Sequence, residues 1–362
     1  MRSFQRSALT LIVLFFQFTT AVAQDVTTRR VSDCVIVLSI SNLGMHTNVT
    51  VIESQKGLVV IETEITPFVM NKIKEAAEKY LGRDDWAYVI NTHNHLHHAG
   101  GNGLFKDVQI IGHKNMRVDW LKDLLSTDKG RRQYCDITGA SQGINNLSRL
   151  LKQNTTTPAQ KKEIQRRINF IREVEKEILA GFEVRNPDIS FQDRLTLYLG
   201  DIHLRLIYWG DAIKHYSICI HIIEENTLVS LGVAGKGLPG DFDDKASLSS
   251  IRRYASVLRD LTNDNIKIDT IIPVHSPDFN VTQQDLRNRY EYLQDLLDGI
   301  TKTKQQGLSL KQVKREFAFD KRYSRFHKVC VLPEDFNKIH QDSINQIWKL
   351  LNEEESPDSS RQ

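Results

Sequence analysis

The sequence is poor in several features that define other classes of protein. It has four cysteines in 362 residues, and no two of them form a Cys-x-x-Cys pair. A zinc site built from thiolates is therefore not expected, and a chain of this length does not need disulfides to fold. After residue 23 there is no run of about 20 consecutive apolar residues, as a membrane-spanning helix requires. The mature chain is therefore expected to be soluble, without stable membrane insertion.

A strong charge of either sign is also missing. The formal net charge is +3, and basic and acidic residues are interleaved even in the most polar stretch, 160–180. Such a balance does not predict nucleic acid or an anionic membrane as partner. A hydrophobic content of 40% and a charged content of 26% are ordinary for a globular protein. The composition does not indicate an oligomeric state. It also does not select among the three conceivable disulfide pairings of the four cysteines.

Residues 1–23 have the pattern of a secretory signal peptide. Arg2 and Arg6 give a positive start, 9–18 an apolar core, and 21–23 the small residues typical of a cleavage site. We therefore expect a secreted or periplasmic protein. The pattern leaves open whether export is into a bacterial periplasm or through a eukaryotic secretory route.

A cluster of four histidines follows the apolar run 86–90. His93, His95, His97 and His98 fall within six residues and are followed by Gly100 and Gly101. A strand that ends in such a turn can direct several imidazoles into one small volume, and imidazole is the commonest zinc ligand. A solvated histidine-rich loop is the alternative, but the cluster is not repetitive and follows a buried type of strand. The pattern therefore favours a metal site.

The segment 92–101, Thr-His-Asn-His-Leu-His-His-Ala-Gly-Gly, resembles the signature of the metallo-β-lactamase superfamily, Thr-His-x-His-x-Asp-His-x-Gly-Gly. The resemblance implies that His93 and His95 bind a first metal and that His98 binds a second one. His97 stands where the family has an aspartate, which binds the second metal and the attacking water. The segment 57–63 is similar to an early strand of the family that ends in an acidic residue, here Glu62.

Further ligands must come from distant parts of the chain, because a catalytic zinc needs three protein ligands and an open position. His275 ends the strand-like run 271–274 and matches the histidine of the family's last motif. The third ligand of the first metal is assigned to His215, although a count from Gly210 ends two residues earlier. The bridging aspartate of the family is replaced by Val233. Substitution by one of the acids at 241–244 is an alternative, but they are more simply a polar turn.

His97 and Val233 stand where the family has aspartates, and neither carries a negative charge. The charge of two metal dications would then be left unbalanced, so a single zinc ion is expected. His93, His95 and His215, or another set of three that includes His97, His98 or His275, would hold it. His97 is then available as the catalytic proton acceptor in place of aspartate. We expect a zinc-dependent hydrolase of small-molecule esters, lactones, amides or similar bonds. The alternative is a catalytically degenerate member that binds a ligand or partner.

Strand-like and helix-like segments alternate in two successive halves, which suits two packed sheets with helices outside. The resemblance implies the same α+β architecture, an αββα four-layer sandwich. We expect this domain at 33–305 with a helical insertion at 114–185, followed by two short helices and a polar tail at 306–362. Apolar residues at helical spacing, Ile164, Ile168, Ile171 and Ile178, predict the buried face of the insertion.

Overall fold

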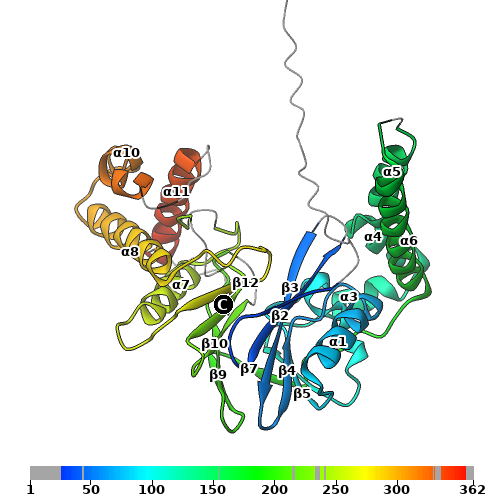
Figure 1. Cartoon of the computed structure of the whole chain (residues 1–362). Coiled ribbons are helices and arrows are strands. Elements are labelled where there is room, and N and C mark those ends of the chain that lie inside the picture. The colour runs from blue at the N-terminus through cyan, green and yellow to red at the C-terminus, as the bar shows by residue number, and fades with distance from the viewer. Residues whose placement is uncertain are drawn as a thin grey trace, which may run out of the picture.

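Two β-sheets form the centre of the protein, and helices cover the outer face of each (Figure 1). The computed structural model describes residues 26–42, 45–153, 155–213, 217–232, 237–239, 242–328, 330 and 336–355. The segment 1–23, for which a signal peptide is predicted, lies outside these residues.

The first sheet has seven strands in sequence order: β1 (Thr27–Arg30), β2 (Val35–Asn42), β3 (Met45–Ser54), β4 (Gly57–Ile61), β5 (Trp86–Ile90), β6 (Gln109–His113) and β7 (Ile189–Phe191). Strands β1 to β4 are antiparallel, whereas β4 to β7 pair in parallel. Carboxyl ends of parallel strands meet at one edge of a sheet. The segments after β4 and β5, which carry the acidic residue and the histidines, therefore lie side by side.

The second sheet has five strands in the order β12 (Thr270–Pro273), β11 (Thr227–Ser230), β10 (Ile218–Ile222), β9 (His203–Tyr208) and β8 (Arg194–Tyr198). Alternate side chains of β10, Ile218, Ile220 and Ile222, pack against Val35, Val37 and other residues of the first sheet, and so form the inner core. Burial of one face by the opposite sheet explains this period of two. With helices outside both sheets, the predicted αββα sandwich is confirmed.

Helices of the N-terminal half cover the first sheet: α1 (Pro67–Leu81) directly, and four helices between β6 and β7, namely α3 (Asp119–Leu125), α4 (Asp128–Ile137), α5 (Ala140–Leu151) and α6 (Pro158–Ala180). These four helices lie within the predicted insertion. All four isoleucines of the predicted face of α6 are buried. Tyr134 of α4 donates a hydrogen bond to the carbonyl oxygen of Ile65 (2.8 Å), so the insertion holds the connection between β4 and α1.

On the other side lie α7 (Leu248–Leu261), α8 (Gln283–Gln305), α9 (Leu310–Glu316), α10 (Phe319–Arg322) and α11 (Phe336–Glu355). The capping box predicted between Thr282 and Asp285 is present at the start of α8. The prediction of two short helices at the C-terminus was wrong, because α11 alone has 20 residues. Ile344, Ile347 and Leu351 of α11 are buried in the same core as α7 and α8.

In the described parts of the chain, no helix is long and apolar enough to cross a membrane. Cys34, Cys135, Cys219 and Cys330 are all free thiols.

Hydrogen bonds join the two sheets at the edge where β5 and β12 end. The backbone N–H of Ile218 donates to the carbonyl oxygen of Thr92 (2.9 Å). The buried side chain of Asn48 donates to the carbonyl oxygens of Pro273 (2.6 Å) and Ser276 (2.7 Å). Asn48 thus holds the chain on both sides of His275. The loop after β5 and the chain around His275, after β12, are therefore fixed relative to each other at this edge.

Candidate metal centre

The histidine loop leaves β5 and turns at once into two short helices, α2 (Leu96–Ala99) and η1 (Gly100–Leu104). The turn is tight because Gly101 lies directly on the preceding chain. A Cβ atom added there would lie 2.1 Å from the carbonyl oxygen of Thr63 and 2.6 Å from the Cβ of Met70. Only glycine fits at this position. The Gly-Gly step therefore allows the imidazoles to be held against the connection between β4 and α1.

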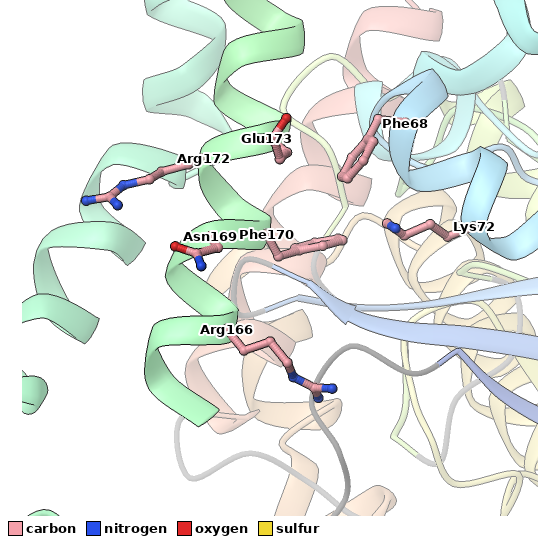
Figure 2. Close-up of a pocket in the computed structure, with 7 residues that line it drawn as sticks. All are labelled: Phe68, Lys72, Arg166, Asn169, Phe170, Arg172 and Glu173. Carbon is pink, nitrogen blue, oxygen red and sulfur yellow. The ribbon is translucent and has the colours of Figure 1, made fainter. Parts of the chain in front are cut away.

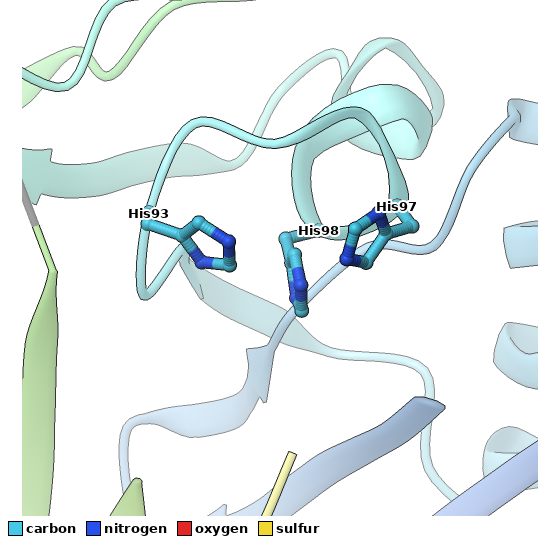
Figure 3. Close-up of side chains that lie close together, drawn as sticks. All are labelled: His93, His97 and His98. Atoms are coloured by element: carbon cyan, nitrogen blue, oxygen red, sulfur yellow. The ribbon is translucent and has the colours of Figure 1, made fainter. Parts of the chain in front are cut away.

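Four imidazoles of the loop gather in one place. Ring centroids are 4.1 Å apart for His93 and His98, 4.1 Å for His97 and His98, and 4.4 Å for His93 and His95. Figure 3 shows His93 and His97 on either side of His98. One ring nitrogen from each of these three residues lies within 4.8 Å of the other two. His93 and His98 are buried, His97 is half-buried and His95 is exposed.

His275, which follows β12 on the second sheet, reaches the same cluster. Its ring centroid is 4.9 Å from that of His98 and 5.1 Å from that of His97. The Nε2 atoms of His98 and His275 are 3.2 Å apart. Two nitrogens that bind one zinc ion tetrahedrally at about 2.0–2.1 Å lie about 3.3 Å from each other. The separation therefore suits two ligands of one ion.

The second nitrogen of each ring determines what these two Nε2 atoms can do. Nδ1 of His275 lies 3.0 Å from the carbonyl oxygen of His46, and a carbonyl only accepts, so Nδ1 carries the proton. Nδ1 of His98 lies 3.1 Å from Oε2 of Glu62, at ion-pair distance but without the angle of a hydrogen bond. When Glu62 is ionised, its carboxylate at that distance favours a proton on Nδ1. Two Nε2 lone pairs then face each other, an arrangement that a cation between them stabilises.

Burial keeps this part of the site uncharged when no cation is present. Glu62 and His98 are both fully inaccessible to solvent. Burial, followed by the neighbouring imidazoles, lowers the pKa of His98 well below its ordinary value. Burial also raises the pKa of Glu62 to about 8, partly opposed by the hydrogen bond that it accepts from the backbone N–H of Thr92 (3.2 Å). A metal ion would displace protons from such groups, since its ligands must be deprotonated.

Polar side chains beneath the loop hold its backbone in place. The carbonyl oxygen of His98 accepts hydrogen bonds from Nδ2 of Asn91 (2.8 Å) and from the hydroxyl of Thr63 (3.1 Å). Asn102 accepts from the same Thr63 hydroxyl (2.7 Å). Sequence reasoning identified Glu62 only as the acid after a strand, and did not find the roles of Asn48, Asn91 or Asn102. Their partners are distant in sequence, so no local pattern marks them.

The structure therefore brings together His93, His95, His97, His98 and His275. Two other predicted positions, His215 and Val233, lie outside the described residues. Asp243 lies in a polar turn, where Oδ1 accepts a hydrogen bond from the backbone N–H of Lys245 (2.9 Å).

A separate hollow of about 480 Å³ lies between α1 and α6 (Figure 2). The rings of Phe68 and Phe170 are 5.7 Å apart there, and Nζ of Lys72 lies 4.7 Å from the Phe68 ring centroid. Asn169 and Arg172, which also border it, point away from Phe68 in this view. The residues lining the hollow include no histidine or cysteine. The histidine cluster therefore remains the candidate site.

The profile of the metallo-beta-lactamase superfamily matches residues 43–275, more than half of the chain. The protein belongs to this superfamily. No curated protein matches the sequence.

Solved structures are similar to this one at low sequence identity. A metallo-beta-lactamase from Pontibacter korlensis is 12% identical, with a TM-score of 0.47, and the match covers 75% of this chain and 99% of that one. The stereoselective inverting sec-alkylsulfatase Pisa1 from Pseudomonas sp. is 12% identical, with a TM-score of 0.50. That match covers 90% of this chain but only 50% of the sulfatase chain. At such identity the likeness concerns the fold alone.

Proposed function

We propose that this protein is an exported, metal-dependent hydrolase with a single zinc ion in an altered superfamily site. The observation that carries the proposal is the approach of His98 and His275, whose Nε2 atoms are 3.2 Å apart while Nδ1 of His275 is bound to a carbonyl oxygen. We assign these two residues as zinc ligands. His93 completes a three-histidine set, an arrangement known for catalytic zinc.

A bound zinc ion lowers the pKa of its water from about 15.7 to about 7 and polarises the bond to be cleaved. The protein's own residues orient and move protons around it. Glu62 holds the ring of His98 from behind, with Oε2 at 3.1 Å from Nδ1. His97 is half-buried, so it is open to solvent where His93 and His98 are not. We assign His97 as the proton acceptor, the role of aspartate in the related signature.

The substrate is proposed to be a small molecule with an ester, lactone, amide or similar bond, as hydrolases of this superfamily act on small molecules. Substrate choice within one fold depends on the loops around the site. The helical insertion α3 to α6 contacts the connection between β4 and α1 through Tyr134, so it supports one side of the site.

Metal analysis of the purified mature protein tests the proposal. We expect about one zinc ion per chain in the native protein and a large loss in a His93→Ala variant. A panel of ester, lactone, thioester and β-lactam substrates should show at least one hydrolysed by the native protein, abolished by chelator and restored by zinc. A His203→Ala variant is the control, because His203 pairs with Glu224 on the surface. Absence of metal together with absence of turnover would contradict the proposal.

A second candidate is a degenerate member that binds a ligand or partner without turnover. It is favoured by the neutral residues, His97 and Val233, at positions where the related signature has aspartates. A protein that keeps its melting temperature in chelator and hydrolyses none of the substrates would support this second candidate.

Export depends on residues 1–23, and secretion or transfer to a periplasm is part of the proposal. Mass spectrometry of the protein recovered from the native host should find a mature N-terminus close to residue 24. An intact Met1 on the active protein would contradict export.

A further inference from the structure

The side chain of Asn48, on β3, spans the junction between the two sheets. The residue is only 3% exposed. Its Nδ2 donates to the carbonyl oxygens of Pro273 (2.6 Å) and Ser276 (2.7 Å), on either side of His275. Its Oδ1 lies 2.9 Å from Nε2 of His46, which donates because an amide oxygen only accepts. Both N–H groups and the oxygen of the amide are therefore bound, and a buried polar group satisfied in this way is held rigidly.

The backbone of β3 binds the same part of the chain at two more points. The N–H of Asn48 donates to the carbonyl oxygen of Val274 (2.8 Å). The carbonyl oxygen of His46 accepts from Nδ1 of His275 (3.0 Å). Asn48 thus binds the carbonyl groups of residues 273, 274 and 276, and His46 binds the imidazole of the residue between them.

These bonds are not part of either sheet. β3 belongs to the first sheet and β12, which precedes His275, to the second (Figure 1). Further along β3, Ile52 packs in the apolar core between the sheets. Thr50, on the same face between Asn48 and Ile52, is fully buried, and its hydroxyl has no hydrogen-bond partner in the described residues. Asn48 therefore differs from its neighbours on this face by its polar contacts with the chain around His275.

We propose that Asn48 is a positioning residue, which together with the carbonyl group of His46 sets the direction in which His275 presents Nε2 to a metal ion. A histidine that binds a metal commonly donates its other ring N–H to a carbonyl oxygen or a carboxylate, and that bond fixes the orientation of the ring. His46 supplies this acceptor, whereas Asn48 fixes the backbone that carries the ring. Nε2 of His275 then lies 3.2 Å from Nε2 of His98. The inference rests on the proposed zinc site, because it concerns the support of one of the assigned ligands.

An Asn48→Leu variant of the full mature chain tests this role, because leucine has a similar volume but makes none of the side chain's hydrogen bonds. Competition with a chromophoric chelator should show zinc affinity falling 10- to 100-fold, the usual effect of changing a group behind a metal ligand. A crystal structure of the metal-free variant should show Nε2 of His275 farther than 3.2 Å from that of His98. A purely structural asparagine predicts a lower melting temperature, with native zinc affinity in the folded protein and an unchanged distance between the two rings.

Two further variants make the result specific to these hydrogen bonds. Thr50→Val also removes a buried polar group from the same face of β3, and it should keep the native zinc affinity. Asn48→Ser keeps one donor, so it should lose less affinity than Asn48→Leu. The serine variant takes the place of Asn48→Leu in both measurements if the leucine variant does not fold.

Native zinc affinity and native ring positions in a folded Asn48 variant would overturn this inference while leaving the zinc site intact. An equal loss of affinity in Thr50→Val would also overturn it, since the loss would then follow from any change inside the junction. A native protein that binds no zinc would instead overturn the proposed function itself, and the role of Asn48 in metal binding with it.

Discussion

Nε2 of His98 and Nε2 of His275 lie 3.2 Å apart although 177 residues separate them in the chain. The first follows β5 of one sheet and the second follows β12 of the other, so their approach depends on how the two sheets pack. Asn48 secures that packing through its hydrogen bonds to Pro273 and Ser276. The candidate metal centre is therefore a property of the assembled sandwich rather than of either half.

Removal of either imidazole of this pair should abolish stoichiometric zinc binding. We expect His98→Ala and His275→Ala each to bind far less than one zinc ion per chain, because two histidines with water hold zinc weakly. Zinc content after dialysis is the measurement. His203→Ala is a useful comparison, since His203 pairs with Glu224 on the surface. Full zinc content in His275→Ala would remove His275 from the ligand set.

Neutralising Glu62 should weaken the metal site without removing a ligand. Glu62→Gln keeps the size of the side chain but loses the carboxylate beside Nδ1 of His98. We expect zinc affinity to fall about 10- to 100-fold, because groups behind a metal-binding histidine orient it and raise its basicity. Isothermal titration with zinc measures the change. Unchanged affinity would show that the contact between Glu62 and His98 has no part in binding.

The metal-free protein should lose stability as the pH rises from about 6.5 to about 8. Burial raises the pKa of Glu62 and Glu64 to about 8, so the folded state keeps protons that the unfolded state has released. Stability then falls with pH, by at most about 1.4 kcal/mol per pH unit for each carboxyl group. His98 has a lowered pKa and acts in the opposite direction, but only below its ordinary value of 6.5.

Urea unfolding at several pH values measures this dependence. A double variant, Glu62→Gln with Glu64→Gln, should remove most of the fall between pH 6.5 and 8. Saturating zinc should also reduce it, because the bound ion stabilises the ionised carboxylates. A native metal-free protein whose stability rises over this interval would contradict the raised pKa values.

Alanine at Gly101 should disturb the histidine loop, whereas alanine at Gly143 should not. A Cβ at Gly101 meets the carbonyl oxygen of Thr63 at 2.1 Å, so we expect a loss of about 1–3 kcal/mol in the free energy of unfolding or more. At Gly143, inside α5, the nearest atom is Cδ1 of Ile171 at 3.4 Å. There alanine should stabilise by about 0.5–1 kcal/mol through helix propensity. Urea unfolding of both variants compares the two sites, and equal effects would refute the proposed contact.

The C-terminal helices are joined by a buried hydrogen-bond chain that can be tested separately. Nε2 of His340 must donate to the carbonyl oxygen of Phe317 (2.7 Å), so its Nδ1 accepts from the hydroxyl of Tyr292 (2.7 Å). Tyr292→Phe leaves that buried nitrogen unsatisfied and should cost about 1–3 kcal/mol of stability. Tyr290→Phe, on the same helix but only partly buried, is the control. Thermal unfolding distinguishes them. An unchanged melting temperature in Tyr292→Phe would show that the hydrogen bond between Tyr292 and His340 does not stabilise the protein.

Local patterns in the sequence were sufficient for much of the fold. Apolar residues at intervals of two and of three to four marked most of the strands and helices, because each element buries one face. The pattern failed at the short edge strands β1 and β7, which have little periodicity, and at α11. It also did not reveal Glu64, because nothing in the sequence near Glu64 shows that its carboxyl group is buried.

The sequence by itself determined which histidines are candidates for a metal site, since a histidine-rich turn after a buried strand and a histidine after a distant strand are both visible in one dimension. Only the tertiary structure decided which imidazoles meet and which carboxyl groups lie behind them. Distances between nitrogens and the burial of charge depend on how two sheets pack, and that packing joins residues with no proximity along the chain.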